Sequence, residues 1–449
     1  MLDLLITGGS CPDFGSGRMI KANIGIRDGC IAYVGGDRPE SAKTLAAEGK
    51  IVSPGFIDIH MHEEDFAAEG ERYVIAEMML RMGVTTAVGG NCGLQRQSVR
   101  SFRQTIDKLG GSPVNYLLLA GYNQQRYALG LGRYEEATEK QRAQIARMIE
   151  QELKDGACGV SFGIEYDPGI STAEITDNLQ CFADSNLLAA AHYRASCTKD
   201  VRAIEEMIEI AQVIPMKFQI SHLSSCAAMG RMEESLALIA AAMDENERLS
   251  FDTYPYNAFS TSLGSEVFAP GCLERWQKDY DCILLTQEPY ENVRCNEEIF
   301  RQAREKYPQM LAVVFAMNEE EIRQAVACRR GMIASDGIIN DGRGHPRAAG
   351  TFPRVLGKYV REEKALSLIE ALEKMTLRPA MRLALDKKGR IAKGCDADLV
   401  IFAADKIADK ADFSDTAAPP AGIDCVLIGG RIAVKDNVII DGRLGRFCG

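Results

Sequence analysis

The stretch 53-SPGFIDIHMHEED-65 decides the fold that we expect for this chain. Residues 56–60 form a short apolar run typical of a buried strand, and the run ends at His60, with His62 two residues further on. In extended backbone, residues i and i+2 point to the same side, so both imidazoles can face one end of a sheet. Two satisfied polar side chains would give the same HxH pattern. The preceding strand and the SPGFID sequence favour metal binding instead.

From this strand onward, apolar β-prone runs alternate with helical stretches. The eight candidate strands are Phe56–His60, Thr85–Asn91, Asn115–Ala120, Gly159–Ile164, Leu188–His192, Lys217–His222, Leu249–Tyr254 and Met332–Asp336. Eight strands that alternate with helices predict a (β/α)8 barrel, with an open doubly wound sheet as the less favoured alternative. The long gap at 263–330 predicts an inserted subdomain or lid.

The two ends of the chain have a different pattern, with short alternating apolar runs separated by glycine-rich turns. This pattern covers roughly 1–53 and 388–449 and is typical of β-structure. Termini that meet in space are common in domains, so we expect both ends to form one β-sandwich. The predicted domains are therefore 1–53 and 388–449 for the sandwich and 54–387 for the barrel.

Composition excludes several classes of function. The chain has 449 residues, 46% of them hydrophobic, and a net charge of −11, which argues against nucleic acid or an anionic membrane as the main partner. No apolar run approaches the ~20 residues that span a bilayer, and the first residues lack the pattern of a secretory signal. The 14 cysteines are scattered singly, which suits a reducing compartment. We expect a cytoplasmic protein.

Residue types that bind metals follow the ends of several predicted strands, where the active sites of barrels lie. Cys92 sits between Asn91 and Gly93 in a loop, a less natural place for a packed structural thiol than for a thiolate ligand. His192 and His222 each end an apolar run, although a strand-end histidine can simply bond a backbone carbonyl. A Cys-His-His set with one open position is the usual pattern of catalytic zinc. The sequence thus predicts zinc on these three residues.

Asp336, in GMIASDG, is the candidate proton carrier. A carboxylate beside a metal site can accept the proton of a water molecule and later deliver it to a leaving nitrogen. Asp-Gly is also ordinary turn chemistry. Its place at the end of the eighth strand favours the catalytic role.

These segments together resemble the N-acyl-D-amino-acid deacylases (D-aminoacylases) of the amidohydrolase superfamily. The similarity covers nearly the whole chain and is carried by SPGFIDIHMHEED, GVTTAVGGNCG, FGIEYDPG, QISH, DTYPYNAFSTSL, ASDG, HPRAAGTFPRVLGKYVRE, KMTLRPAMRL and GRIAKGCDADLVIF. The resemblance implies a barrel with a β-sandwich and the hydrolysis of an amide by a metal-activated water. It implies a tight zinc site on Cys92, His192 and His222, with Asp336 as the acid/base. It also implies a second, weakly or variably filled metal site on His60 and His62.

The resemblance further implies substrate-binding residues. Tyr254 and Ser260, in YPYNAFS, match residues that contact the substrate carboxylate and the region of the reacting carbonyl. Arg347 matches the arginine that pairs with that carboxylate, and a guanidinium fork suits this task because it gives two parallel hydrogen bonds. His345 belongs to the same substrate-facing loop, where we expect it to position Arg347 without binding metal.

The chain also departs from the pattern of its relatives. Strand four, GVSFGIEY, lacks the carboxylated lysine that bridges two metals in other superfamily members, so Cys92 is the expected bridging or anchoring ligand. After His222 the chain reads Leu223-Ser224, where members that favour acidic D-amino acids have a cation. A preference for D-glutamate or D-aspartate is therefore not expected, and the segment 263–330 matches poorly.

The leading hypothesis is a zinc-dependent hydrolase of N-acyl-D-amino acids or similar N-acyl compounds. A cyclic amidase of the hydantoinase or dihydroorotase kind is the alternative, and a non-catalytic amidohydrolase-like scaffold is a third. The expected partner is a small N-acyl amino acid. The acyl group, side chain, stereochemistry, number of metals and assembly into a homo-oligomer are left open.

Overall fold

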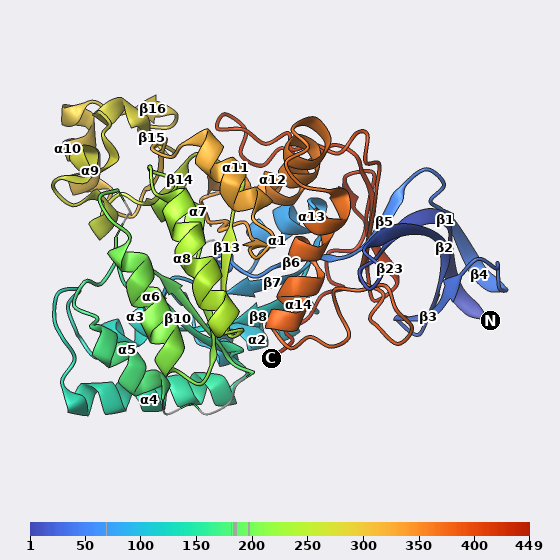
Figure 1. Cartoon of the computed structure of the whole chain (residues 1–449), viewed down its shortest axis with the longest axis horizontal. Helices are drawn as coiled ribbons and strands as arrows, with labels where there is room; N and C mark the ends of the chain where they lie inside the picture. The colour runs from blue at the N-terminus through green and yellow to red at the C-terminus, as the bar shows by residue number, and fades with distance from the viewer. Residues whose placement is uncertain (69, 181, 183–185, 196–197) are drawn as a thin grey trace.

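A computed structural model describes residues 1–68, 70–180, 182, 186–195 and 198–449 (Figure 1).

Parallel strands run through the centre of the molecule. The central strands are β6 (Phe56–Asp58), β7 (Val84–Gly89), β8 (Asn115–Leu118) with its continuation β9 (Ala120–Gly121), β10 (Gly159–Gly163), β11 (Leu188–His192), β12 (Lys217–Ile220), β13 (Leu249–Thr253) and β18 (Met332–Ile333). Each overlaps one of the eight predicted strands, and their ends differ by at most three residues.

The strands lie side by side in the order of the sequence. They form two parallel sheets, β6-β7-β8 and β9-β10-β11-β12-β13-β18, which Leu119 joins between β8 and β9. On the other side, the segments that follow β6 and β18 are hydrogen-bonded. The Asp336 N–H donates to the His60 carbonyl at 2.8 Å, and the His62 N–H donates to the Gly337 carbonyl at 2.9 Å. The carboxyl ends of the first and last strands are thereby held together.

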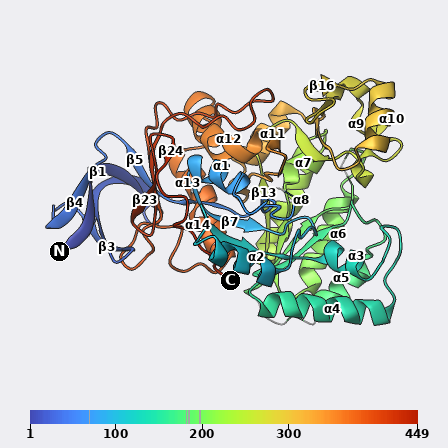
Figure 2. The same ribbon diagram turned by 180° about the vertical axis from the view of Figure 1, so that it is seen from behind.

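Helices surround the strands (Figures 1 and 2). They are α1 (Ile75–Arg81), α2 (Val99–Lys108), α3 (Tyr122–Ala128), α4 (Glu139–Lys154), α5 (Thr172–Leu179), α6 (Arg202–Val213), α7 (Leu223–Ala227), α8 (Met232–Glu245), α11 (Glu319–Ala327), α12 (Arg347–Arg354), α13 (Leu368–Met375) and α14 (Leu377–Arg382). In α4 a capping box of Thr138 and Gln141 starts the helix, and Ile145 and Ile149 are buried one turn apart. No helix in the described ranges has both the length and the apolar character needed to cross a membrane.

Both ends of the chain contribute to one further sheet. It contains β1 (Leu2–Asp13), β2 (Arg18–Arg27), β3 (Cys30–Gly35), β4 (Ser41–Ala46), β5 (Ile51–Pro54), β21 (Leu399–Phe402), β22 (Ile423–Ile428), β23 (Arg431–Lys435) and β24 (Val438–Ile439). Hydrogen bonds join all nine strands into a single sheet, because β5 pairs with both β1 and β21. The Ile31 N–H donates to the Cys395 carbonyl at 2.8 Å, so the sheet folds back on itself around a shared core.

An inserted subdomain lies at the opposite end of the molecule from β1–β4 in both ribbon views. Its four-stranded sheet contains β14 (Phe259–Ser262), β15 (Ile283–Leu285), β16 (Val293–Arg294) and β17 (Leu311–Val314), with helices α9 (Cys272–Trp276) and α10 (Glu297–Lys306). The predicted limits 263–330 are shifted from the observed ones. The sheet begins already at Phe259, and α11 leaves the insertion to pack on α8. Short elements complete the chain: η1 (Glu266–Phe268), η2 (Tyr280–Cys282), η3 (Val355–Glu362), β19 (Ile339–Asn340) and β20 (Arg343–Gly344).

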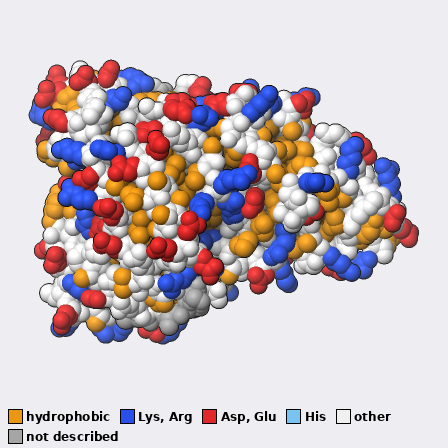
Figure 3. All heavy atoms as spheres, viewed as in Figure 1, with side chains coloured by type: hydrophobic (Ala, Val, Ile, Leu, Met, Phe, Trp, Pro, Cys, Tyr) orange, Lys and Arg blue, Asp and Glu red, His pale blue; other side chains and the backbone are white. Residues whose placement is uncertain are grey.

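The last residues of the chain cover the amino end of β8. Tyr116 donates its N–H to the Arg446 carbonyl at 2.8 Å and accepts the N–H of Cys448 at 2.8 Å. The opposite, carboxyl end of the strands is left for the polar residues described next. On the face seen in Figure 3, acidic and basic side chains are intermingled.

Candidate metal and substrate site

Four residues predicted as metal ligands meet at the carboxyl ends of the strands. The donor atoms of Cys92, His192 and His222 all lie within 4.8 Å of one another. The Cys92 sulfur is 3.4 Å from Nε2 of His222 and 3.4 Å from Nε2 of His60. All four side chains are buried. The structure therefore brings the predicted Cys-His-His set together, with His60 directly beside it.

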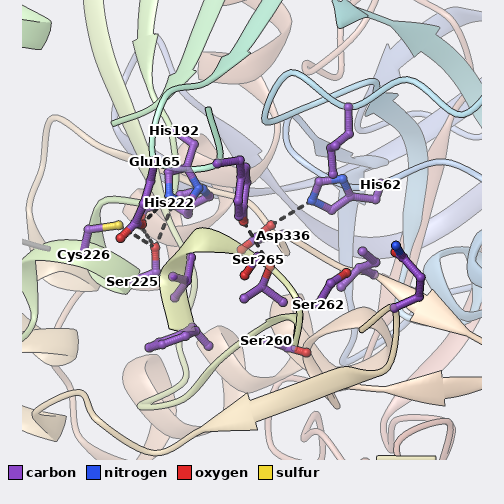
Figure 4. Close-up of a pocket in the computed structure, with 18 of the residues that line it drawn as sticks. His62, Glu165, His192, His222, Ser225, Cys226, Ser260, Ser262, Ser265 and Asp336 are labelled. Atoms are coloured by element: carbon purple, nitrogen blue, oxygen red, sulfur yellow. Dashed lines mark hydrogen bonds and ion pairs between the residues drawn. The ribbon is translucent and has the colours of Figure 1, made fainter. Parts of the chain in front are cut away.

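The two histidines of this set are each held through one ring nitrogen. Nε2 of His192 bonds Oε2 of Glu165 at 2.9 Å, and Nδ1 of His222 bonds Oγ of Ser225 at 2.7 Å. Nδ1 of His192 is buried and has no hydrogen-bond partner among the described residues. A ligating histidine normally bonds an oxygen through its second nitrogen. Figure 4 shows His192 and His222 with Glu165 and Ser225. Two imidazoles fixed in this way beside the Cys92 thiol fit a zinc ion.

A second cluster contains the predicted proton carrier. Donor atoms of His60, His62, Cys92 and Asp336 lie within 4.8 Å of one another. Oδ1 of Asp336 is 3.3 Å from Nε2 of His62 and 3.5 Å from Nε2 of His60. Its other oxygen, Oδ2, is 2.8 Å from Nη1 of Arg347. Asp336 thus stands between the histidine pair and the arginine, as Figure 4 shows for His62.

The backbone is strained where these side chains leave it. Cys92, His222 and Asp336 have φ values of 56°, 34° and 49°, in the left-handed region that non-glycine residues seldom occupy. Gly93 is also left-handed, and a Cβ there would lie 1.7 Å from Oδ1 of Asn123. Strain of this kind persists only where the surroundings enforce it, and it concentrates at functional sites.

Charges around the cluster decide the ionisation of Cys92 and Asp336. Burial raises the pKa of the Cys92 thiol, but the His60 and His222 rings outweigh burial and hold the pKa well below its usual value. Burial also acts to raise the pKa of Asp336, and the Arg347 guanidinium and His222 reverse that effect, so the pKa is lowered. A thiolate ligand and an ionised carboxylate both follow from this environment.

Two buried carboxylates support the site, and the sequence reasoning missed them. Asp252 accepts the backbone N–H of His222 at 2.8 Å and lies 3.5 Å from Nδ1 of His60. Glu63 accepts the N–H of Gly90 at 2.7 Å, which holds the loop that carries Cys92. Asp252 lies near the end of the predicted strand Leu249–Tyr254. The predicted ligands also lie at strand ends, so this position could have identified Asp252 as a site residue from the sequence.

Cys226 is a further residue that the sequence did not single out. Its sulfur belongs to a third donor group with Glu165 and His192. Burial raises its pKa, but the neighbouring His192 and His222 lower it to about 7. Among the cysteines of the described ranges, Cys226 and Cys92 stand beside these histidines, and all twelve described cysteines are free.

A cavity of about 340 Å³ opens over these groups. Its lining comes from strand ends and from the insertion: His62, Leu94, Tyr127, Arg133, Glu165, Tyr166, His192, His222, Ser225, Cys226, Phe259, Ser260, Thr261, Ser262, Gly264, Ser265, Val267, Pro308, Gln309, Asp336 and Ile338. Figure 4 shows Ser260, Ser262 and Ser265 on the wall that faces the histidines. The cavity therefore joins the candidate metal centre to the inserted subdomain.

Three of the predicted substrate-binding residues meet beside Asp336. Ser260 lines the cavity, whereas Tyr254 and Arg347 are buried and are not among its lining residues. The guanidinium of Arg347 lies 4.7 Å from the ring centre of Tyr254, and its Nη2 donates to the Ser260 carbonyl at 3.2 Å. Buried polar atoms without a hydrogen-bond partner, among the described residues, include Oη of Tyr254, Oγ of Ser260 and Nε of Arg347. Each of these three groups can donate a hydrogen bond to a polar ligand.

His345 contacts the backbone of Arg347 and is not among the residues that line the cavity. Its side chain is buried, does not line the cavity, and both ring nitrogens are bonded within the protein. Nε2 contacts the Ala258 carbonyl at 3.1 Å, and Nδ1 accepts the N–H of Arg347 at 3.0 Å. Burial and the Arg347 charge hold the pKa of His345 well below its usual value. The structure thus places His345 as a support for the start of α12, without a direct path to substrate.

Comparisons with known proteins agree with this geometry. Residues 330–434 match the model of a family described as "Amidohydrolase family". The chain is 30% identical to a D-aminoacylase of Alcaligenes xylosoxydans xylosoxydans over 99% of this chain and 97% of the relative. It is 31% identical to an N-acyl-D-glutamate deacylase of the same organism, over 96% and 93%. A crystal structure of N-acyl-D-glutamate deacylase from Bordetella bronchiseptica, complexed with zinc and a phosphonate inhibitor, superposes with a TM-score of 0.88 at 29% identity, over 99% of each chain.

Proposed function

The chain belongs to the N-acyl-D-amino-acid deacylase (D-aminoacylase) family of amidohydrolases, and on that premise we propose that it hydrolyses the amide bond of N-acyl-D-amino acids. Its relatives are metal-dependent hydrolases of C–N bonds other than peptide bonds, and this chain is an enzyme of that class. The observation that carries the proposal is the buried Cys92, His192 and His222 donor set with Asp336 beside it.

We also propose that the eight central strands form one closed (β/α)8 barrel. The hydrogen bonds between the segments after β6 and β18, and the short Leu119 link between β8 and β9, support closure. In this view residues 54–387 form the barrel, and residues 1–53 and 388–449 form the β domain. The catalytic residues would then stand at the carboxyl end of the barrel, where (β/α)8 enzymes keep their active sites.

Zinc fits the Cys92, His192 and His222 set, and these residues would hold it tightly. When bound, zinc polarises a substrate carbonyl and lowers the pKa of a water molecule. His60 and His62 supply donors for a second, weaker divalent site beside Cys92. Glu165 and Ser225 keep the imidazoles of His192 and His222 in one orientation.

Asp336 moves the proton in this proposal. Oδ1 points toward His60 and His62, where the attacking water would stand, and accepts one of its protons as the water oxygen bonds to the carbonyl carbon. The C–N bond then breaks, and Asp336 delivers the proton to the departing amine. The products are a carboxylic acid and a free D-amino acid. Arg347, held on Oδ2, keeps the carboxylate of Asp336 turned in this direction.

The substrate carboxylate is assigned to Tyr254, Ser260 and Arg347. Their unpaired Oη, Oγ and Nε atoms supply donors that a carboxylate can satisfy. A substrate carboxylate bound here would lie beside Asp336. This position would orient the substrate amide towards Asp336, the proton carrier. His345 contributes by fixing the backbone of Arg347.

The test is a substrate panel with the purified, zinc-loaded protein. N-acetyl-D-amino acids should be hydrolysed much faster than their L enantiomers and faster than hydantoins. Turnover of hydantoins alone would overturn the proposal in favour of a cyclic amidase. The described part of β10 (Gly159–Gly163) and its flanking segment contain no lysine, which speaks for the linear amide. The cytoplasmic location and assembly into a homo-oligomer stay predictions.

A further inference from the structure

One cation lines the outer side of the cavity, and a carboxylate already faces it. Arg133, in the segment between α3 and α4, has Nη1 at 3.6 Å from Oε2 of Glu266 in the insertion. The same nitrogen lies 3.4 Å from the Gly264 carbonyl. Arg133 thus contacts the insertion, and the Glu266 carboxylate neutralises its charge.

The Glu266 carboxylate is fixed in this position. Oε2 accepts the hydroxyl of Tyr134 at 2.6 Å, and the Glu266 side chain is only 18% exposed, against 41% for Arg133. The segment that carries Arg133 is fixed as well. The buried Arg126 donates to the carbonyls of Gly132 and Glu135. Both charges are therefore parts of ordered structure, and substrate binding would not have to assemble them.

The two carboxylates of the cavity lining, Glu165 and Asp336, also have partners within the protein. Glu165 holds His192, and Asp336 contacts Arg347 and His62. Among the described lining residues, Arg133 is the single arginine or lysine. An acidic substrate side chain would therefore meet no unpaired cation, and burying a carboxylate without a partner is costly.

The rest of the outer wall, residues 259–267 with Arg133, is uncharged apart from this pair. Besides Ser260, which is assigned to the substrate carboxylate, it offers the hydroxyls of Thr261, Ser262 and Ser265 beside the apolar Phe259 and Val267. Oγ of Ser265 is buried and unpaired among the described residues, so it can bond an uncharged polar group. This mixture suits amide, hydroxyl or aliphatic side chains.

Building on the proposed deacylase function, we propose that this enzyme selects D-amino acids with uncharged side chains, and that Glu266 sets the selection by neutralising Arg133. D-Glutamine and D-glutamate derivatives have nearly the same shape and differ in charge. The enzyme should therefore separate them by charge alone.

The experiment compares kcat/KM for N-acetyl-D-glutamine and N-acetyl-D-glutamate. The wild-type enzyme should favour the glutamine compound by at least about tenfold. Glu266→Gln leaves Arg133 without its carboxylate and should shrink this ratio by about fivefold, a modest effect because Arg133 is partly exposed. Arg133→Gln should enlarge the ratio, because it leaves the Glu266 charge without its cation.

Glu274→Gln is the matched control, since Glu274 is an exposed carboxylate of the same insertion that does not line the cavity. Its ratio should equal that of the wild type. A wild-type enzyme that prefers the glutamate compound, or a Glu266→Gln ratio equal to that of Glu274→Gln, overturns the selection mechanism while the deacylase function stands. Absence of turnover on every N-acyl-D-amino acid would defeat the proposed function itself, which separates the two failures.

Discussion

The inner and outer walls of the cavity differ in how they are built. The inner wall contains His192, His222 and Asp336, with Cys92 buried next to them, and stands at the ends of central strands. Buried partners fix these residues, and the backbone of Cys92, His222 and Asp336 is strained. The outer wall comes from the insertion and from the segment between α3 and α4. On the proposed function, catalysis and substrate selection therefore depend on separate parts of the chain. Changes to the inner wall should affect all substrates alike, and changes to the outer wall should redistribute activity among them.

The largest expected effect belongs to the inner wall. Asp336→Asn keeps the shape of the side chain but removes its ability to accept a proton. We expect kcat to fall by about 10²–10⁴-fold on every N-acyl-D-amino acid tested. Steady-state kinetics together with zinc analysis checks this, and near-normal turnover with zinc still bound would contradict the role of Asp336.

The support of the outer wall gives the next effect. Glu174, fully buried, pairs with Arg126 at 2.6 Å, and Arg126 anchors the segment that carries Arg133. Glu174→Gln leaves a buried cation without its carboxylate and should lower the free energy of unfolding by about 3 kcal/mol. Denaturant unfolding measures this loss. Asp177→Asn, which removes an exposed ion pair of the same helix, should cost less than about 1 kcal/mol. Equal losses in the two variants would refute the anchoring role.

The support of the inner wall can be tested without an activity assay. Glu165 fixes the ring of His192, so Glu165→Gln should weaken zinc affinity by about tenfold in a chelator competition. Glu206→Gln removes a carboxylate that pairs with Arg194 instead, and it should leave the affinity unchanged. Unchanged zinc binding in Glu165→Gln would show that Glu165 is not needed to position His192.

The smallest effect concerns the carboxylate end of the substrate. Tyr254→Phe removes one unpaired hydroxyl beside Arg347, and KM should rise by about fivefold with little change in kcat. Tyr256→Phe is the control, because its hydroxyl is also buried and unpaired but its ring packs on Arg354 and His345. If the two variants raise KM equally, Tyr254 has no special contact with substrate.

The strand ends were the part of the molecule that the sequence could predict. The apolar runs before His192 and His222 stop at the residues that enter the cluster, because a buried strand must be apolar until it reaches the polar mouth. Cys92 was identifiable from its place in a glycine-flanked loop. The left-handed conformations of Cys92, His222 and Asp336 had no such signal, since no local pattern favours them in non-glycine residues.

The remaining features depend on contacts between residues that are distant in sequence, which no local sequence pattern indicates. His345 is close to Arg347 in sequence, but its second contact, from Nε2 to the carbonyl of Ala258, joins residues distant in sequence and had no local signal. The start of the insertion at Phe259 depends on pairing with Val314 across the subdomain. The joining of β5 to β21 likewise depends on contacts between the two chain ends.

Cys92, His192 and His222 are proposed to hold the catalytic metal. Zinc analysis of the Cys92→Ala variant tests this directly. The wild-type protein, dialysed against a weak chelator, should retain zinc, and the variant should lose it along with its deacylase activity while remaining folded by circular dichroism. A folded Cys92→Ala protein that retains zinc as tightly as the wild type would contradict the account.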